Sequence, residues 1–301
     1  HRDLHSFPTR RSSDLIQNST SVLILSVLLG LVLPGPAGAT EALVTPALMV
    51  MMAFSLTEVD LGRDIKSSAS LKRGFLGIII NYGLLSGLIL LLSYSLPDES
   101  LRHGFVIMAA VPPAVAVLPM TRILKGDMSL SFAGEILSYL ASLLLMPLII
   151  YLFVHQTGIS PIYLLQISIV LILIPALASR LVRLLPINPV LPINLGFFLV
   201  TYTVIGLNQG ALWTDGWSVA WISIARTFAV GLAVFILARS AGLKSSQAIS
   251  LTLLGSFKNL GLAAAVSLLL VGPAAGLPAA FCVLAETAFF ILLSFARSRY
   301  P

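Results

Sequence analysis

The chain has 301 residues, of which 57% are hydrophobic and 10% are charged. Soluble domains carry about 25% charged residues, so this composition excludes an ordinary water-soluble fold and also a disordered chain. The formal net charge of +6 forms no basic cluster, which excludes a nucleic-acid-binding protein. The composition therefore predicts an integral membrane protein whose main partner is the lipid bilayer.

The first residues are set apart from the rest of the chain. Residues 5–15 read HSFPTRRSSDL and resemble a translated sequencing adapter. We therefore treat residues 1–15 as a non-native segment and exclude them from the prediction of the fold. The single cysteine, Cys282, excludes an internal disulfide and a thiolate metal cluster.

Ten stretches of the chain are candidates for membrane-spanning helices, each of which needs about 20 mostly apolar residues. Cutting at charges and turn residues gives the ranges 19–37, 41–58, 74–96, 104–121, 128–154, 160–182, 190–209, 217–240, 246–271 and 277–297. The sequence thus predicts an all-α polytopic membrane protein.

The distribution of basic residues predicts the orientation of these spans. Loops on one side hold only Arg102, whereas twelve Lys and Arg residues lie on the other side or at the C-terminal end: Arg63, Lys66, Lys72, Arg73, Arg122, Lys125, Arg180, Arg183, Arg239, Lys244, Arg297 and Arg299. By the positive-inside rule both termini face the cytoplasm, which agrees with an even number of spans.

The two halves of the chain, residues 16–157 and 158–301, have a similar outline of five spans each. Because five is odd, the second half would be inverted relative to the first. In both halves the fourth span is interrupted by residues that disfavour a helix. Inverted repeats with interrupted helices in matching positions are typical of a transporter whose substrate site lies at the breaks.

Span four is interrupted by three prolines, Pro112, Pro113 and Pro119. A proline has no N–H and clashes with the carbonyl four residues earlier, so the carbonyls of Met108, Ala109 and Val115 would lose their helical donors. An unpaired carbonyl at membrane depth costs several kcal/mol, about 2–7. The pattern therefore favours a true break that faces protein or water over a simple kink.

Span nine is interrupted by the segment Gly255-Ser256-Phe257-Lys258-Asn259. A lysine near the centre of a span costs about 2.5–3.5 kcal/mol to insert, so Lys258 must find acceptors. The carboxylates available within spans belong to Glu135 and Glu286, and the sequence leaves their pairing open. Arg226, the other candidate buried cation, is expected to be structural or to reach toward the cytoplasmic interface.

These interrupted spans resemble the bile acid:sodium symporter family, as a divergent prokaryotic-type member. The segment Val111–Ser131 reads VPPAVAVLPMTRILKGDMSLS, and Phe257–Leu262 reads FKNLGL. Seven residues fall in step with the family pattern: Met120, Thr121, Lys125, Gly126, Asp127, Leu130 and Ser131. The resemblance covers residues 16–300 and implies two inverted repeats, with broken, crossing helices four and nine. It also implies a core of spans three to five and eight to ten, and a panel of spans one, two, six and seven.

The resemblance fails at the residues that bind sodium in the family. A Ser-Asn pair is replaced by Val117 and Leu118, a bridging glutamate by Leu254, and its glutamine partner by Lys258. Ser131 keeps its hydroxyl, whereas a threonine ligand corresponds to Glu135 and a glutamine on span three corresponds to Asn81. Hard cations need several oxygen ligands, and an ammonium group repels them.

We therefore expect that Lys258, paired with Glu135 or Glu286, replaces the sodium ion. If this lysine loses and regains its proton, transport is coupled to H⁺; if it stays charged, transport is independent of sodium. Helix N-termini at the breaks, together with Lys258, favour a small organic anion as the substrate. The candidate site residues are Asn81, Pro112, Pro113, Thr121, Ser131, Glu135, Ser256, Lys258, Asn259 and Glu286.

Other functions were weighed against this one. A sodium-coupled symporter of the same family is the first alternative. The segment Ala285–Phe289 also resembles arsenite efflux carriers, but their cysteine on the first broken helix corresponds to Val111 here. A channel is the third alternative. We expect no enzyme and no cofactor, because no His-Glu-x-x-His motif is present and no span centre holds an aspartate. The expected location is the cell (inner) membrane of a bacterium or archaeon.

Overall fold

The structure is a computed structural model that describes residues 19–58, 68–154, 160–214 and 216–299. Within these ranges the regular structure is helical, apart from one isolated bridge between Pro113 and Lys258. By length and composition, seven helical runs in this part of the chain could cross a membrane: Ala37–Ser55, Gly74–Ser93, Met128–Phe153, Pro161–Val182, Val190–Leu207, Gly216–Ser240 and Pro273–Arg297. The prediction of an all-α membrane protein is confirmed, whereas the adapter-like residues 1–15 lie outside the described residues.

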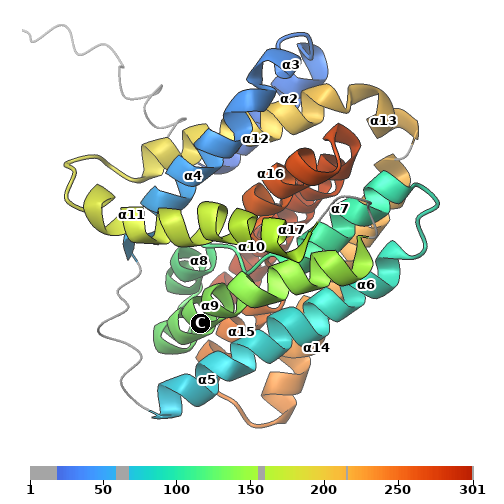
Figure 1. Cartoon of the computed structure of the whole chain (residues 1–301). Helices are drawn as coiled ribbons and strands as arrows, with labels where there is room; N and C mark the ends of the chain where they lie inside the picture. The colour runs from blue at the N-terminus through green and yellow to red at the C-terminus, as the bar shows by residue number, and fades with distance from the viewer. Residues whose placement is uncertain (1–18, 59–67, 155–159, 215, 300–301) are drawn as a thin grey trace, which may run out of the picture.

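The helices follow one another closely along the chain (Figure 1). In the first half they are α2 (Ser19–Val32), α3 (Ala37–Thr40), η1 (Glu41–Leu43), α4 (Val44–Ser55), η2 (Leu56–Glu58), α5 (Ser68–Ile78), η3 (Ile79–Leu85), α6 (Ser86–Ser93), α7 (Glu99–Ala110), α8 (Val117–Ile123) and α9 (Met128–Phe153). In the second half they are α10 (Pro161–Ser168), η4 (Ile169–Leu173), α11 (Ile174–Val182), α12 (Val190–Leu207), α13 (Gln209–Thr214), α14 (Gly216–Ser240), α15 (Ser245–Leu254), α16 (Leu260–Leu270) and α17 (Pro273–Arg299). Both η3 and η4 are π-helical turns.

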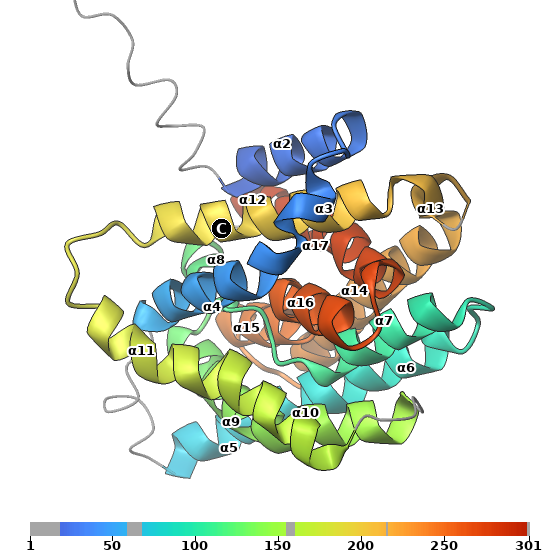
Figure 2. The ribbon, with the colours of Figure 1, turned by 45° about the horizontal axis from the view of Figure 1, so that its top comes forward.

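The helices pack in two groups. Helix α12 packs against α2 and α4, and α4 packs against α11, so these helices lie together in both views (Figures 1 and 2). In the other group α5 packs against α9, α6 against α7, and α14 against α15 and α17. Helix α10 contacts α9 and thereby joins the α11 side of the first group to the second.

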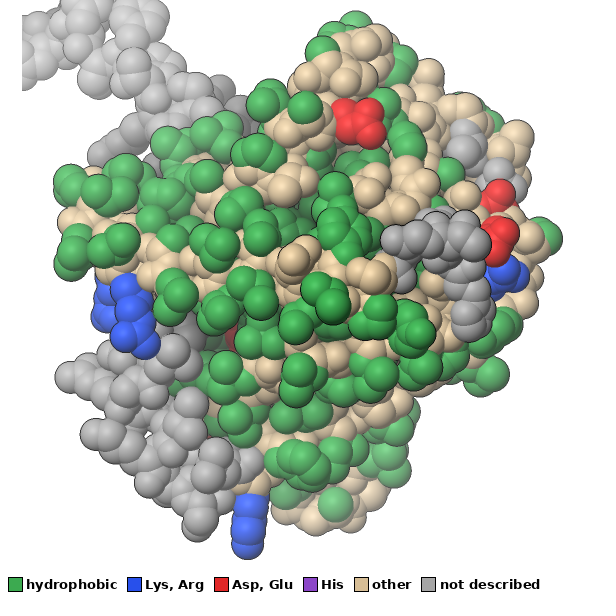
Figure 3. Space-filling view, viewed as in Figure 1, with side chains coloured by type: hydrophobic (Ala, Val, Ile, Leu, Met, Phe, Trp, Pro, Cys, Tyr) green, Lys and Arg blue, Asp and Glu red, His purple; other side chains and the backbone are tan. Residues whose placement is uncertain are grey.

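Apolar side chains cover much of the outer surface. Figure 3 shows one face that is mostly hydrophobic, with Lys, Arg, Asp and Glu side chains gathered at its margins. Large side chains such as Leu91, Leu144 and Leu177 are exposed. Exposed apolar surface of this extent would be unfavourable in water, and it is what a protein surrounded by lipid hydrocarbon presents.

The first predicted break is present between α7 and α8. Helix α7 begins after Asp98, whose carboxylate accepts the N–H of Leu101 (2.8 Å) as an N-cap. It ends at Ala110 because the next residue, Val111, precedes a proline and is extended (φ −75°, ψ 156°). Helix α8 tolerates Pro119 because the residue lies in its first turn, where no intrahelical N–H bond is lost.

The second predicted break is present between α15 and α16. Helix α15 ends at Leu254 and is followed by Gly255. Helix α16 begins after Asn259, whose side-chain oxygen accepts the N–H of Leu262 (3.0 Å). The short polar cap therefore restarts the helix five residues after the first half has ended.

Candidate functional site

The two unwound segments, residues 111–116 and 255–259, lie side by side in antiparallel orientation. The N–H of Asn259 donates to the carbonyl of Pro112 (2.9 Å), and the N–H of Ala114 donates to the carbonyl of Phe257 (3.4 Å). Each break thus satisfies backbone groups of the other that have no helical partner. We refer to this contact as the crossing.

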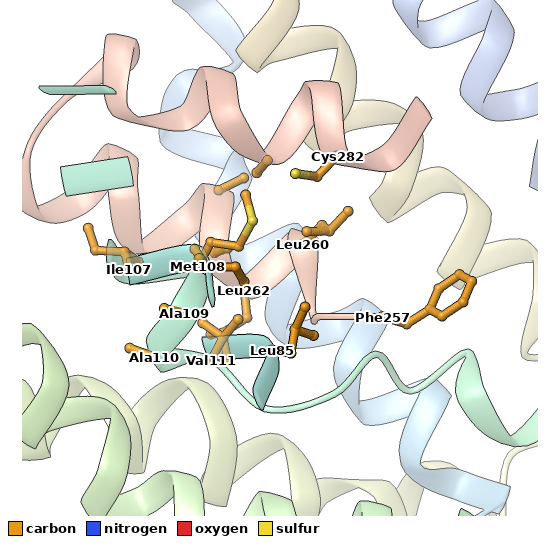
Figure 4. Packing of buried hydrophobic residues seen from close by; sticks show 14 of the residues in the cluster. Leu85, Ile107, Met108, Ala109, Ala110, Val111, Phe257, Leu260, Leu262 and Cys282 are labelled. Carbon is orange, nitrogen blue, oxygen red and sulfur yellow. The ribbon is translucent and has the colours of Figure 1, made fainter. Parts of the chain in front are cut away.

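Apolar side chains surround the crossing and exclude water from it. Figure 4 shows Leu85, Val111 and Leu262 close together, while Phe257 points away from them. On that side the ring of Phe257 lies 6.4 Å from the ring of Phe289. The polar groups described next therefore lie in a packed and buried interior.

The ammonium group of Lys258 lies at the centre of the crossing, and this residue is fully buried. Its Nζ donates to four oxygens: Asn81 Oδ1 (2.7 Å), the Val111 carbonyl (2.8 Å), Ser86 Oγ (2.9 Å) and the Ala109 carbonyl (3.0 Å). Nζ also lies 4.5 Å from the centre of the Tyr82 ring, a distance at which a cation is attracted to an aromatic face.

The lysine closes the C-terminal end of α7. The carbonyl of Ala109 would normally accept from residue 113, but Pro113 has no N–H. The carbonyl was therefore predicted to need another donor, and it has two: Lys258 Nζ and the hydroxyl of Ser86 (2.6 Å). A cation at a helix C-terminus is also favoured by the helix dipole.

Asn81 forms hydrogen bonds both with the backbone of the second break and with the side chain of Lys258. It lies in the π-helical turn η3 and is fully buried. While its Oδ1 accepts from the ammonium, its Nδ2 donates to the carbonyls of Leu254 (2.7 Å) and Phe257 (3.5 Å). Asn81 therefore replaces helical donors at the end of α15, in the way that Lys258 does at the end of α7.

The expected ion pair between Lys258 and a carboxylate is wrong. Glu286 Oε1 accepts from the backbone N–H of Lys258 (3.0 Å), and its ion pair is with Arg226 Nη2 (2.7 Å). The acceptors of the lysine side chain are the four uncharged oxygens. These neutral oxygens can stabilise the buried positive charge because two of them are carbonyls at the end of a helix, whose dipoles point at the ammonium.

Arg226 does not reach toward the membrane interface, as one of its two predicted roles required. Its side chain is fully buried, and its Nη1 donates to the carbonyl of Ser256 in the second break (3.2 Å). Arg226 was not among the predicted site residues because nothing in the sequence of α14 shows which side of the helix faces the break.

The remaining candidate residues form contacts beside the crossing. Asn259 Nδ2 donates to the hydroxyl of Tyr139 on α9 (2.9 Å). Thr121 and Ser131 are fully buried and share a hydrogen bond between their hydroxyls (2.7 Å), which joins α8 to α9. Glu135 is buried on α9 and is not among the four acceptors of the ammonium group.

The positions that correspond to sodium ligands carry hydrocarbon. Val117, Leu118 and Leu254 are all buried among apolar groups. The side chain of Leu254 packs so closely on α9 that a Cβ added to Gly134 would lie 2.6 Å from its Cδ1. Together with the ammonium of Lys258, this donor set does not fit a sodium ion. Among the described residues, no group of three or more His, Cys, Asp and Glu side chains is arranged to hold a metal ion.

Two contributors to the site were missed by the sequence analysis. Ser86 donates to Ala109 and accepts from Lys258, and Tyr82 offers its ring to the ammonium. Both follow Asn81 within one or two turns, so their position beside a predicted site residue was a usable signal. The carbonyls of Ala109 and Val111 complete the site and depend on the end of α7 rather than on side-chain type.

A family model described as "Sodium Bile acid symporter family" matches residues 45–209, which is more than half of the chain. No curated protein matches the chain.

Proposed function

The chain belongs to the sodium bile acid symporter family, and from this premise we propose that it carries a small organic anion across the membrane by alternating access without sodium. The buried ammonium of Lys258 at the crossing carries this proposal. This ammonium supplies the positive charge that a bound sodium ion would supply in other members of the family. The family match and the apolar helices identify the chain as a transporter of this family and an integral membrane protein.

We propose ten spans in two inverted repeats. Besides the seven long runs, α2 would be one span, and the pairs α7–α8 and α15–α16 would each form a broken span. The packing is consistent with inversion, because α7 contacts α16 and α17 while α15 contacts α8 and α9. Each first half-helix thus packs against the broken and final spans of the other repeat.

We propose that the helices around the crossing form the moving core and that α2, α4, α11 and α12 belong to the panel. The two packing groups described above support this division. The excess of Lys and Arg on one side supports termini in the cytoplasm. A bacterial or archaeal cell membrane is the proposed location.

The chemistry of the crossing supports the proposal of sodium independence. Rebuilding a sodium site there would require oxygen ligands where Leu254 and Val117 place hydrocarbon. It would also place the ion close to an ammonium that already occupies four oxygens. Both features oppose a second cation.

The geometry around Lys258 favours its charged form. An ammonium has three N–H donors and no lone pair, and all four neighbouring oxygens lie within 3.0 Å of Nζ. A neutral amine would have two donors, and its lone pair could accept only from the Ser86 hydroxyl, which already donates to the Ala109 carbonyl (2.6 Å). We therefore propose that the lysine stays charged during transport and does not carry a coupling proton.

An anionic substrate is consistent with the charges at the crossing. The two buried cations, Lys258 and Arg226, lie beside Glu286, and a second buried carboxylate, that of Glu135, lies on α9. Helix α16 also begins here, and a helix N-terminus carries partial positive charge. The partial positive charge at the start of α16 would attract an anion to the neighbourhood of the crossing without direct contact with the ammonium of Lys258, whose N–H groups already have acceptors.

Uptake into vesicles tests this function. Purified protein in liposomes would be given a panel of labelled monocarboxylates and dicarboxylates, with sodium or choline outside and with or without a pH gradient. We expect uptake of at least one anion at equal rates in sodium and choline. Uptake that requires sodium would overturn the proposal, and uptake driven by a pH gradient but lost in Lys258→Gln would assign the coupling proton to Lys258. The exposed Lys72→Gln is the matched control.

No observation favours the alternatives as strongly. For thiol-assisted arsenite export, Cys282 is on α17 rather than on a broken helix, and its thiol contacts Ser223 (3.1 Å). A channel would pass far more ions per second than the turnover of any carrier allows, and recording from planar bilayers would detect the resulting single-channel currents.

A further inference from the structure

The second break is held by two charged side chains that belong to different helices. Arg226 on α14 donates from Nη1 to the carbonyl of Ser256 (3.2 Å). Glu286 on α17 accepts the backbone N–H of Lys258 with Oε1 (3.0 Å). Arg226 and Glu286 therefore form hydrogen bonds with the backbone on both sides of Phe257.

The two side chains also hold each other. Arg226 Nη2 and Glu286 Oε1 are 2.7 Å apart, and the exposed fractions of the two side chains are 0% and 8%. One carboxylate oxygen thus accepts from the guanidinium and from the lysine backbone. If either partner is lost, the other becomes an uncompensated buried charge next to the break.

This arrangement determines where the lysine side chain can reach. With Ser256 and Lys258 held from the α14 and α17 side, and the Leu254 carbonyl held by Asn81 (2.7 Å), the backbone of the break is fixed from two directions. The side chain of Lys258 then extends to the end of α7, where it meets Ala109 and Val111. Polar contacts at an unwound segment are not supplied by a helix, so other elements must supply them.

We propose that Arg226 and Glu286 act as one positioning pair, which orients the second break so that the ammonium of Lys258 closes α7 and the crossing is competent for transport. This rests on the proposed function and assigns a role to Arg226. It also replaces the expectation that Glu286 binds a substrate or an ion. The competing role is a plain ion pair that fastens α14 to α17.

Two substitutions of Glu286 separate these roles. Glu286→Gln keeps an oxygen that can accept from Lys258 N–H, whereas Glu286→Met has similar size and no such oxygen. We expect Glu286→Met to lose at least about tenfold in uptake rate relative to Glu286→Gln, the effect of one hydrogen bond. Equal rates for the two variants at equal folded amounts would overturn the proposal.

A charge swap gives a second test. In the double variant Arg226→Glu, Glu286→Arg the ion pair can form again, but no donor on α14 faces Ser256 and no acceptor on α17 faces Lys258. We expect its thermal stability to recover relative to the single variants while uptake stays at least about tenfold below wild type. Recovery of both would show that the pair only fastens two helices.

The matched control is Ser223→Ala. Ser223 lies on the same helix as Arg226, and its hydroxyl accepts from Cys282 on α17, so it also joins α14 to α17 but does not contact the break. Uptake by this variant should equal that of wild type. If Ser223→Ala lowered uptake as much as Glu286→Met does, any loosening of α14 and α17 would suffice and the positioning role would be refuted.

Hydrogen exchange makes the test independent of the transported solute. Relative to Glu286→Gln, in which Arg226 has equally lost its charged partner, we expect the amides of residues 255–259 in Glu286→Met to exchange at least about tenfold faster, with α14 and α17 the same in the two variants. Faster exchange spread over α14 and α17 would contradict the proposal. If the wild-type protein requires sodium, the proposed function fails while this result still decides the role of the pair.

Discussion

Replacing Lys258 by methionine and by glutamine tests whether its ammonium stabilises the broken helix. Both variants lose the charge, so the cost of burying an ammonium cancels when they are compared. Methionine has no donor, whereas the amide of glutamine has two. The carbonyl of Ala109 keeps the Ser86 hydroxyl (2.6 Å) in either variant. The difference therefore lies in the Val111 carbonyl and Asn81 Oδ1.

The size of the effect follows from these two oxygens. A buried acceptor left without a donor costs about 1–3 kcal/mol in soluble proteins. Hydrogen bonds between membrane helices contribute less, about 0.6 kcal/mol on average. Two acceptors thus give a range from about 1 to about 6 kcal/mol, and we expect Lys258→Met to be less stable than Lys258→Gln by about 2 kcal/mol.

Unfolding in mixed detergent micelles measures this difference. Purified variants would be titrated with dodecyl sulfate, and the free energies of unfolding compared at a common micelle composition. Lys72→Met and Lys72→Gln, at an exposed position, provide the control pair and should not differ. A difference below about 0.5 kcal/mol between the two Lys258 variants would refute the view that this side chain satisfies the end of α7.

Three further predictions concern the neighbouring contacts. Thr121→Val removes the hydroxyl contact with Ser131 and should lower the free energy of unfolding by about 1 kcal/mol, with a double-mutant cycle showing coupling between the two positions. Gly134→Ala places a methyl group 2.6 Å from Leu254 and should lower the free energy of unfolding by about 1–3 kcal/mol. Adding Leu254→Ala should partly reverse this loss in the same dodecyl sulfate titration. Independent effects of the two substitutions on the free energy of unfolding would contradict the packing. A hundredfold excess of Na⁺ over K⁺ should not raise the melting temperature of the wild-type protein. In the double variant Leu254→Glu, Lys258→Gln, which removes the ammonium and one hydrocarbon side chain, the same excess of Na⁺ should raise the melting temperature.

The sequence predicted the breaks correctly because local chemistry determines them. Pro112 and Pro113 lack N–H groups, so α7 must end there whatever surrounds it. In the second break a glycine ends one helix and Asn259 caps the next. These effects act over a few residues and can be read from a single chain.

Asn81 was among the predicted site residues, but the contacts of Asn81 and Ser86 with Lys258 were not predicted because they depend on long-range packing. Asn81 and Ser86 lie more than 170 residues away in the chain. Their orientation also depends on the π-helical turn Ile79–Leu85, which rotates the following residues relative to an α-helix and has no local sequence signal. Charge counting suggested a lysine–carboxylate pair, but it could not anticipate that Arg226 would take the carboxylate.

The cross-links between the breaks indicate which parts of the protein would move in the proposed cycle. Asn259 donates to Pro112, and Lys258 donates to Val111, so neither break can shift without breaking contacts in a dry interior. The boundary between α12 and α16–α17 is different, because a small crevice there is lined mostly by apolar side chains such as Phe197 and Val283. Asn208 at the end of α12 donates from Nδ2 to the Pro273 carbonyl (2.8 Å), but the apolar surfaces of this boundary can slide without leaving polar groups unpaired, whereas those of the crossing cannot. In the proposed cycle, alternation would fall at the boundary with α12, and the crossing would move as one unit together with the ammonium of Lys258.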